Sequence, residues 1–163
     1  MLKELGKYKD CLYSILANDK NICQLLLGKD YANKFDDLDM ELEQYILPHL
    51  YTEPVVTDTQ SYIFFETYMP RASPTIKTMK ISVQAVCHKN IARYTEKPQN
   101  YYGLRYDILS QYIEELLCPS DKETIKKRIK QFGIGRFELQ SVDLILSNDF
   151  VGRNMTFIVP DFR

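Results

Sequence analysis

Residues 79–87 alternate between apolar and mostly polar side chains, and this pattern constrains the fold of the chain more than any other. The apolar positions are Met79, Ile81, Val83, Ala85 and Cys87. A period of two residues is typical of a β-strand with one buried face and one face in water. The pattern therefore predicts a half-exposed antiparallel sheet, with these five side chains facing the core.

Two pairs of strands are predicted, and each pair is joined by a short connecting segment. The first pair spans residues 60–69 and 75–88, and the second spans residues 137–146 and 155–159. We expect residues 70–74 to form a loop, because proline cannot donate a hydrogen bond to a strand ladder. The alternation in the first strand of the second pair predicts a wet face and an opposite apolar face. Ser141 and Asp143 are on the first of these faces, and on the second are Val142, Leu144 and Leu146.

Three segments have apolar residues three and four positions apart, which is the spacing of an amphipathic helix. They cover residues 2–16, residues 102–118 and a short basic segment over residues 121–131. The segment 102–118 has the most continuous apolar face, and Pro119 follows it directly. We therefore expect this segment to be the long helix that covers the sheet.

Capping residues predict where two of the shorter helices begin and end. One short helix is expected between a cap at Asn18 or Asp19 and a C-terminal Gly28. Ser120 and Glu123 have the spacing of a capping box, so we expect the basic helix to begin there.

The order of these elements predicts an α+β fold. We expect an antiparallel four-stranded sheet built from two hairpins, packed against a long helix, with further helices near the N-terminus. The length of 163 residues predicts a single domain over residues 1–163. Within it, we expect a helical N-terminal part over residues 1–45 and an α+β core over residues 46–163.

No catalytic or metal-binding pattern is recognisable in the sequence. His49 and His88 are the only histidines, and neither has a nucleophile or carboxylate at a spacing that indicates activation. The cysteines are too far apart for a metal motif, so we expect reduced core thiols, no metal, no cofactor and no enzymatic activity. The four cysteines are Cys11, Cys23, Cys87 and Cys118.

Charge excludes further classes of partner. The net charge is −1, which gives no overall attraction to nucleic acid or anionic lipid, so we expect no specific nucleic-acid binding. No run approaches the ~20 apolar residues of a membrane span, so we expect no membrane partner.

Two charged segments are interpreted as solvated surfaces. Residues 36–43 alternate acidic and apolar side chains, and the pattern is ambiguous between a helix and an extended chain. We interpret this segment as a solvated acidic surface. Residues 122–130 are interpreted as a solvated helix packed through Ile125 and Ile129.

Several segments together resemble one known family, and the resemblance covers most of the chain after about residue 45. The segments are Ile46-Leu47-Pro48, Tyr62-Ile63-Phe64-Phe65-Glu66, the strand ending Val86-Cys87-His88-Lys89, the helix 103–117, and Phe150-Val151-Gly152-Arg153 before residues 155–159. In these features the chain resembles the tail-terminator and neck proteins of tailed bacteriophages, which join head and tail.

The resemblance implies a structural virion protein that assembles in the bacterial host cytoplasm. Such proteins form rings, commonly six-fold, that terminate the tail and join it to the head. The implied partners are other copies of the chain, the tail tube and the head–tail connector. A small non-catalytic adaptor domain is the alternative, because the same fold features would serve it.

We expect the contacts with other proteins to come from two loops and from the C-terminal residues. The loops at residues 70–74 and 89–99 leave opposite ends of one predicted strand. Pro160 is expected to stop ladder pairing, which would leave Phe162 free to pack on a neighbour. The predicted protein-binding residues are Arg71, Ser73, Lys89, Arg93, Asp161, Phe162 and Arg163.

Overall fold

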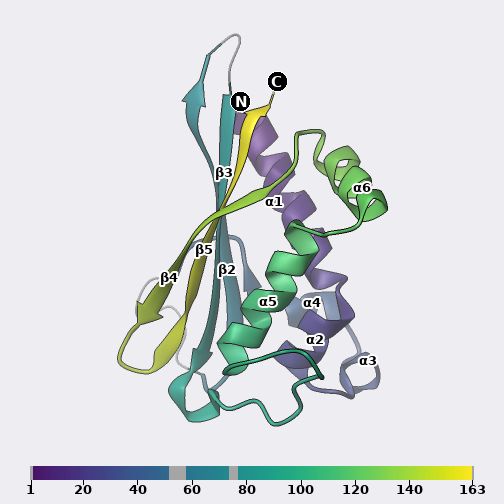
Figure 1. The fold of residues 1–163 in the computed structure, drawn as a ribbon. Coiled ribbons are helices and arrows are strands. Elements are labelled where there is room, and N and C mark those ends of the chain that lie inside the picture. The colour runs from purple at the N-terminus through teal and green to yellow at the C-terminus, as the bar shows by residue number, and fades with distance from the viewer. Residues whose placement is uncertain (1, 52–57, 74–76, 163) are drawn as a thin grey trace.

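The computed structural model describes residues 2–51, 58–73 and 77–162, which form one layer of helices packed on one face of a twisted β-sheet (Figure 1). The helices are α1 (Leu2–Ala17), α2 (Lys20–Leu27), α3 (Tyr31–Lys34), α4 (Leu38–Leu42), α5 (Arg105–Leu117) and α6 (Lys122–Phe132), with a 3₁₀ turn, η1 (Lys89–Ile91). The strands are β1 (Ile46–Leu47), β2 (Ser61–Ala72), β3 (Lys77–His88), β4 (Glu138–Leu146) and β5 (Phe150–Phe162).

The sheet is mixed, and in the described residues it has five strands in the order β1-β2-β3-β5-β4. The predicted α+β class and the four antiparallel strands are confirmed. The prediction of a purely antiparallel four-stranded sheet is wrong, because β1 pairs with β2 in parallel, with Ile46 opposite Ile63. A strand of two residues is too short to show a period, so no alternation pattern could predict it.

The core lies between the sheet and the helices, as the alternation in β3 predicts. Met79, Ile81, Val83, Ala85 and Cys87 all have 0% exposed side chains. The partners of β3 continue this buried face: Val83 lies between Phe65 of β2 and Met155 of β5. Helix α5 covers the face with its own apolar stripe, which includes the buried Ile108, Leu109, Ile113 and Leu117.

Two prolines expected to end strands lie inside them instead. Strand β2 continues through Pro70 to Ala72, and β5 continues through Pro160 to Phe162. Each lies at a shift in register, one between Tyr68 and Arg71 and the other where Lys77 pairs with Phe162. An irregularity of this kind tolerates proline, because the missing N–H need not pair. Both the expected loop at Pro70 and the expected end of pairing at Pro160 are therefore wrong.

Side-chain caps define where three helices begin, which the sequence left ambiguous. The backbone N–H of Ile22 donates to Asp19 Oδ1 at 2.9 Å, so Asp19 rather than Asn18 caps α2. Asp121 caps α6 by accepting from the N–H of Thr124 at 2.8 Å, which corrects the capping box expected from Ser120. The acidic segment is helical, because Asp37 accepts from the N–H of Met40 and begins α4.

Burial raises the pKa of all four thiols, and the effect is largest for three of them. It raises the pKa of Cys23, Cys87 and Cys118 to about 11, from an ordinary value of 9.0. Because the folded-state pKa is higher, these thiols contribute stability that is complete below about pH 9 and is lost as the pH rises towards 11. We expect the free energy of unfolding to fall over this interval, measured by urea denaturation at pH 7, 9 and 10.5.

A matched measurement separates the thiols from the buried tyrosines, which also titrate at high pH. Cys87→Ala removes one buried thiol, so the loss of stability between pH 7 and 10.5 should be smaller in this variant than in the parent. An unchanged pH dependence in Cys87→Ala would contradict the assignment. At pH 8, iodoacetamide should modify the folded protein slowly and all four cysteines quickly in urea.

Candidate functional site

The residues predicted to contact other proteins lie at two ends of the sheet and do not form one site. Arg71 lies near the end of β2, and Ser73 is exposed just after it. Asp161 and Phe162 end β5, where the backbone of Phe162 pairs with Lys77 at the start of β3. These four predicted positions share the end of the sheet at which Figure 1 draws the start of α1.

Lys89 and Arg93 lie at the opposite end of β3, and both side chains are exposed. The backbone N–H of Lys89 donates to the carbonyl oxygen of Asp149 at 2.8 Å, which ties η1 to the turn between β4 and β5. The length of β3 separates the two groups by about 35 Å, at 3.3 Å per residue. Arg163 lies outside the described residues.

The edge strand β4 carries an apolar stripe that the fold leaves uncovered. Val142, Leu144 and Leu146 are 49%, 51% and 70% exposed. Val142 pairs with the buried Met155, so the stripe lies on the helix-facing side of the sheet. Helix α5 packs over β3 and β5, and β4 lies beyond them at the edge of the sheet (Figure 1). The two faces of β4 are assigned as predicted, but the apolar face is in water.

The other face of the sheet has a small aromatic cluster of its own. Tyr51 covers it: its ring centre is 5.5 Å from that of Phe64, and its N–H donates to Gln84 Oε1 at 2.7 Å. The Tyr51 hydroxyl lies 3.1 Å from Ser147 Oγ. Part of the sheet that the alternation assigned to water is therefore buried. The cluster consists of Tyr62, Phe64, Val86 and Phe150.

Both histidines make structural contacts around this cluster. The His49 ring lies 5.5 Å from the ring of Phe64, and the His88 ring lies 5.3 Å from the ring of Phe150. His88 Nδ1 accepts from the N–H of Asn90 at 3.1 Å, which caps η1. Each histidine therefore packs against an aromatic ring of this cluster, and His88 also fixes the start of η1.

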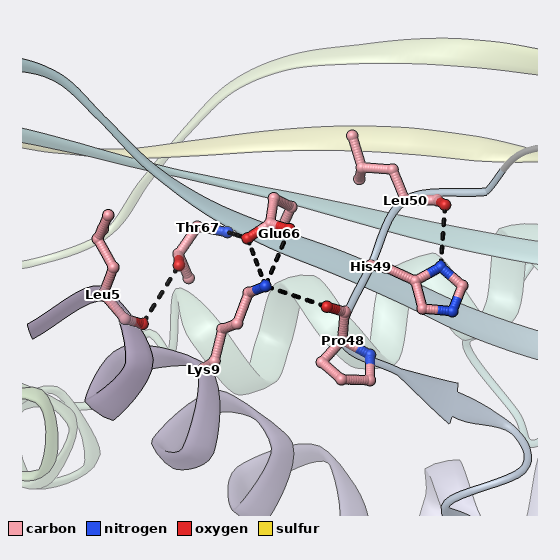
Figure 2. A network of polar contacts seen from close by, with 7 residues as sticks. All are labelled: Leu5, Lys9, Pro48, His49, Leu50, Glu66 and Thr67. Atoms are coloured by element: carbon pink, nitrogen blue, oxygen red, sulfur yellow. Dashed lines mark hydrogen bonds and ion pairs between the residues drawn. The ribbon is translucent and has the colours of Figure 1, made fainter. Parts of the chain in front are cut away.

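Figure 2 shows a polar network that joins α1 to β2 and to the segment after β1. Lys9 Nζ lies 2.7 Å from Glu66 Oε1 and donates to the carbonyl oxygen of Pro48 at 3.1 Å. Thr67 Oγ1 donates to the carbonyl oxygen of Leu5 at 3.3 Å. The Lys9 and Glu66 side chains are about a third exposed, so this network orients α1 on the sheet and adds little stability.

A hollow of about 400 Å³ between α2 and the segment after η1 contains Arg105. The Arg105 guanidinium has hydrogen-bond partners within the chain, because its Nε donates to the carbonyl oxygen of Ile91 at 2.8 Å. Its carbon lies 4.7 Å from the centre of the Tyr94 ring. The arrangement holds the long β3–α5 connection against α2, so the charge of Arg105 is committed within the fold.

No three His, Cys, Asp or Glu side chains among the residues that the structure describes are placed to hold a metal ion. The thiols of Cys23, Cys87 and Cys118 have a pKa of about 11, so they are not activated nucleophiles at neutral pH. No helix among the described residues has the length and apolar character needed to cross a membrane.

The described residues form a small α+β protein with an exposed apolar stripe on its edge strand β4. The chain belongs to the YomW family, whose model matches residues 19–159. This match suggests a phage-associated protein. No curated protein matches the chain.

Proposed function

We propose that this protein is a structural, non-catalytic component of a phage virion or tail-like particle. Copies assemble in the bacterial host cytoplasm into a ring, of six-fold symmetry, that terminates the tail and joins it to the head. The ring contacts the tail tube on one side and the head–tail connector on the other. Membership of the YomW family supports the association with phage, and the resemblance described above supports the position at the neck.

The observation that carries this proposal is the uncovered apolar stripe on β4. An edge strand presents unpaired backbone N–H and C=O groups, so natural proteins usually protect it with lysine, proline or a covering element. Strand β4 has a bulge between Leu139 and Ser141 and carries Asp143, but it contains neither lysine nor proline. It exposes Val142, Leu144 and Leu146 on one face. An exposed apolar stripe on an edge strand is typical of a protein that is covered by another chain in its working state.

The predicted contact residues form two groups at opposite ends of the sheet, and this separation supports the same proposal. A ring at a tail end has one partner above and another below. Arg71, Ser73 and residues 161–162 lie at one end of β3, while Lys89 and Arg93 lie at the other. With the sheet aligned along the tail axis, one group would meet the tube and the other the connector.

Incorporation into particles tests the function directly. We expect Leu144→Asp to reduce incorporation strongly, because a charge on the stripe opposes burial against a partner. Ser141→Asp is the matched control, since it adds the same charge to the wet face of the same exposed strand and should be incorporated normally. The measurement is the amount of each variant in purified particles when it replaces the parent in the producing cell.

The contact residues at the sheet ends are tested in the same assay. Arg71→Ala with Arg93→Ala, or removal of residues 161–163, should leave the melting temperature within a few degrees and lower incorporation. Particles that contain every variant at the parental level would contradict the assigned contacts. A parent protein that is never found in particles would contradict the neck function and favour the adaptor alternative.

A further inference from the structure

Helix α6 presents a basic and partly apolar stripe to solvent. Its exposed residues Lys122, Lys126, Ile129 and Lys130 have helical spacing, so they lie on one side of the helix. Ile129 is 37% exposed in the middle of these lysines. Figure 1 shows α6 at the outside of the helical layer, next to α1.

This stripe is not used for packing within the chain. Helix α6 is anchored by the buried Phe132 and by Arg128, whose Nε donates to the carbonyl oxygen of Leu116 at 2.8 Å. The expectation that Ile125 and Ile129 pack the helix is therefore only partly met, because Ile125 is half-buried and Ile129 is more exposed. Lys126 has a partner in Glu123 at 3.8 Å, but both side chains are highly exposed and the pair is weak.

A second surface also combines an exposed apolar side chain with charged neighbours, but there the charges are negative. Around α4, Met40 is 63% exposed. Asp39 lies in α4 beside Met40, while Asp36 precedes the helix and Glu43 follows it, and all three are exposed. We call Asp36, Asp39, Met40 and Glu43 the α4 patch, and we call Lys122, Lys126, Ile129 and Lys130 the α6 stripe. The charges of the patch are negative, and those of the stripe are positive, with Glu123 beside Lys126 as an acidic neighbour.

The α4 patch and the α6 stripe lie on opposite sides of α1. Cys11 Sγ of α1 lies 3.7 Å from the carbonyl oxygen of Gln131 at the end of α6. Tyr13 of α1 is instead near Asp39 and Glu43, whose charges help to raise its pKa after the larger effect of burial. Two residues along a helix is a rotation of about 200°, so the two neighbours flank α1. The two surfaces of one copy therefore cannot meet each other.

We propose that the α6 stripe of one copy docks on the α4 patch of a second copy, and that this is the lateral contact of the ring. The contact would bury Ile129 against Met40, with lysine–carboxylate pairs around them. That is the usual arrangement of an apolar centre with a charged rim. The proposal rests on the proposed function, because a ring requires a contact of this head-to-tail type.

Charge complementarity is the reason to propose a second copy of the chain as the partner of the α6 stripe. The two surfaces lie on opposite sides of α1, so a compact two-fold contact would be centred on only one of them. It would then place charges of the same sign against each other, and they would repel. A contact between the two different surfaces pairs opposite charges and repeats from copy to copy. Each copy then presents the complement of its neighbour, while the net charge of the chain stays close to zero.

A complementary charge swap tests the contact. Variant one carries Lys126→Glu and Lys130→Glu, and variant two carries Asp36→Lys and Glu43→Lys, which leaves the Asp37 cap intact. We expect each variant alone to associate about 10- to 100-fold more weakly than the parent, because like charges would face each other. Mixing the two should restore association, since each altered surface would meet its new complement. Sedimentation velocity over a range of concentrations at low salt measures all three samples.

The control variant carries Lys20→Glu and Lys97→Glu, which make the same change in net charge at exposed positions elsewhere. It should associate like the parent. A parent that stays monomeric at low salt, or a mixture no better than its components, would overturn the contact. Restored association without entry into particles would keep the contact and overturn the neck function, so the two failures are distinguishable.

Discussion

Replacing Val83 with aspartate is expected to unfold the protein. Val83 is 0% exposed and lies in the central strand β3, opposite Phe65 on one side and Met155 on the other. An unpaired buried charge costs about 3–5 kcal/mol, in addition to the lost burial of the valine. A domain of this kind has only about 5–15 kcal/mol of stability. We expect loss of the cooperative urea transition, or an insoluble protein.

The same substitution at an exposed position of the sheet is the control. Val142 in β4 is 49% exposed, so Val142→Asp should change the free energy of unfolding by no more than about 1 kcal/mol. Circular dichroism during urea denaturation measures both variants in the same way. A Val83→Asp protein as stable as Val142→Asp would show that the buried face of β3 is wrongly assigned.

Replacing Gly152 with alanine has the second largest expected effect. A Cβ atom at this position in β5 would collide with the carbonyl oxygen of Ala85 and would lie 2.9 Å from Val86 Cα. Both are backbone atoms of β3, so no side-chain rotation can relieve the contact. Overpacking of this kind destabilises by roughly 1–3 kcal/mol and occasionally more. We expect a lower midpoint of urea unfolding, or separation of β3 from β5.

Gly6→Ala is a control in which the same substitution should have the opposite effect on stability. It lies within α1, and a Cβ atom there would have no neighbour within 4 Å. Alanine in a helix interior is about 0.5–1 kcal/mol more favourable than glycine, so Gly6→Ala should raise the melting temperature. Equal effects of the two substitutions would contradict the close approach of β3 and β5.

The parts of the fold that could be predicted are those with a clear period. The alternation around Val83 identified the buried face of β3, and the apolar spacing of residues 102–118 identified α5. Strand β1 has two residues and no period, so it could not be seen. Pro70 and Pro160 were interpreted as strand ends because an irregular register, which depends on the partner strand, is not visible in one sequence.

The surfaces could be predicted less well, because exposure depends on what the rest of the chain covers. The sequence assigned Leu144 to an apolar face, but it could not show that α5 ends short of that face. Likewise, Ile129 was interpreted as a residue that packs its helix, and residues 36–43, which include Met40, were interpreted as a solvated acidic surface. Their exposure beside charges of opposite sign, on two sides of α1, follows only from the three-dimensional arrangement.

The position of β5 has a consequence for how the protein is made. Strand β5 follows β4 in sequence, yet it lies between β3 and β4 and joins the two hairpins. Until residues 150–162 have been synthesised, β3 has a bare apolar edge and β4 has no partner. Strands β1, β2 and β3 can pair before β5 is made, but β4 joins the sheet only through β5. The pairing of β3 with β5 connects distant parts of the chain, and such contacts form slowly. During that interval the nascent chain needs protection from its neighbours, so lower temperature or added chaperones should raise the soluble yield.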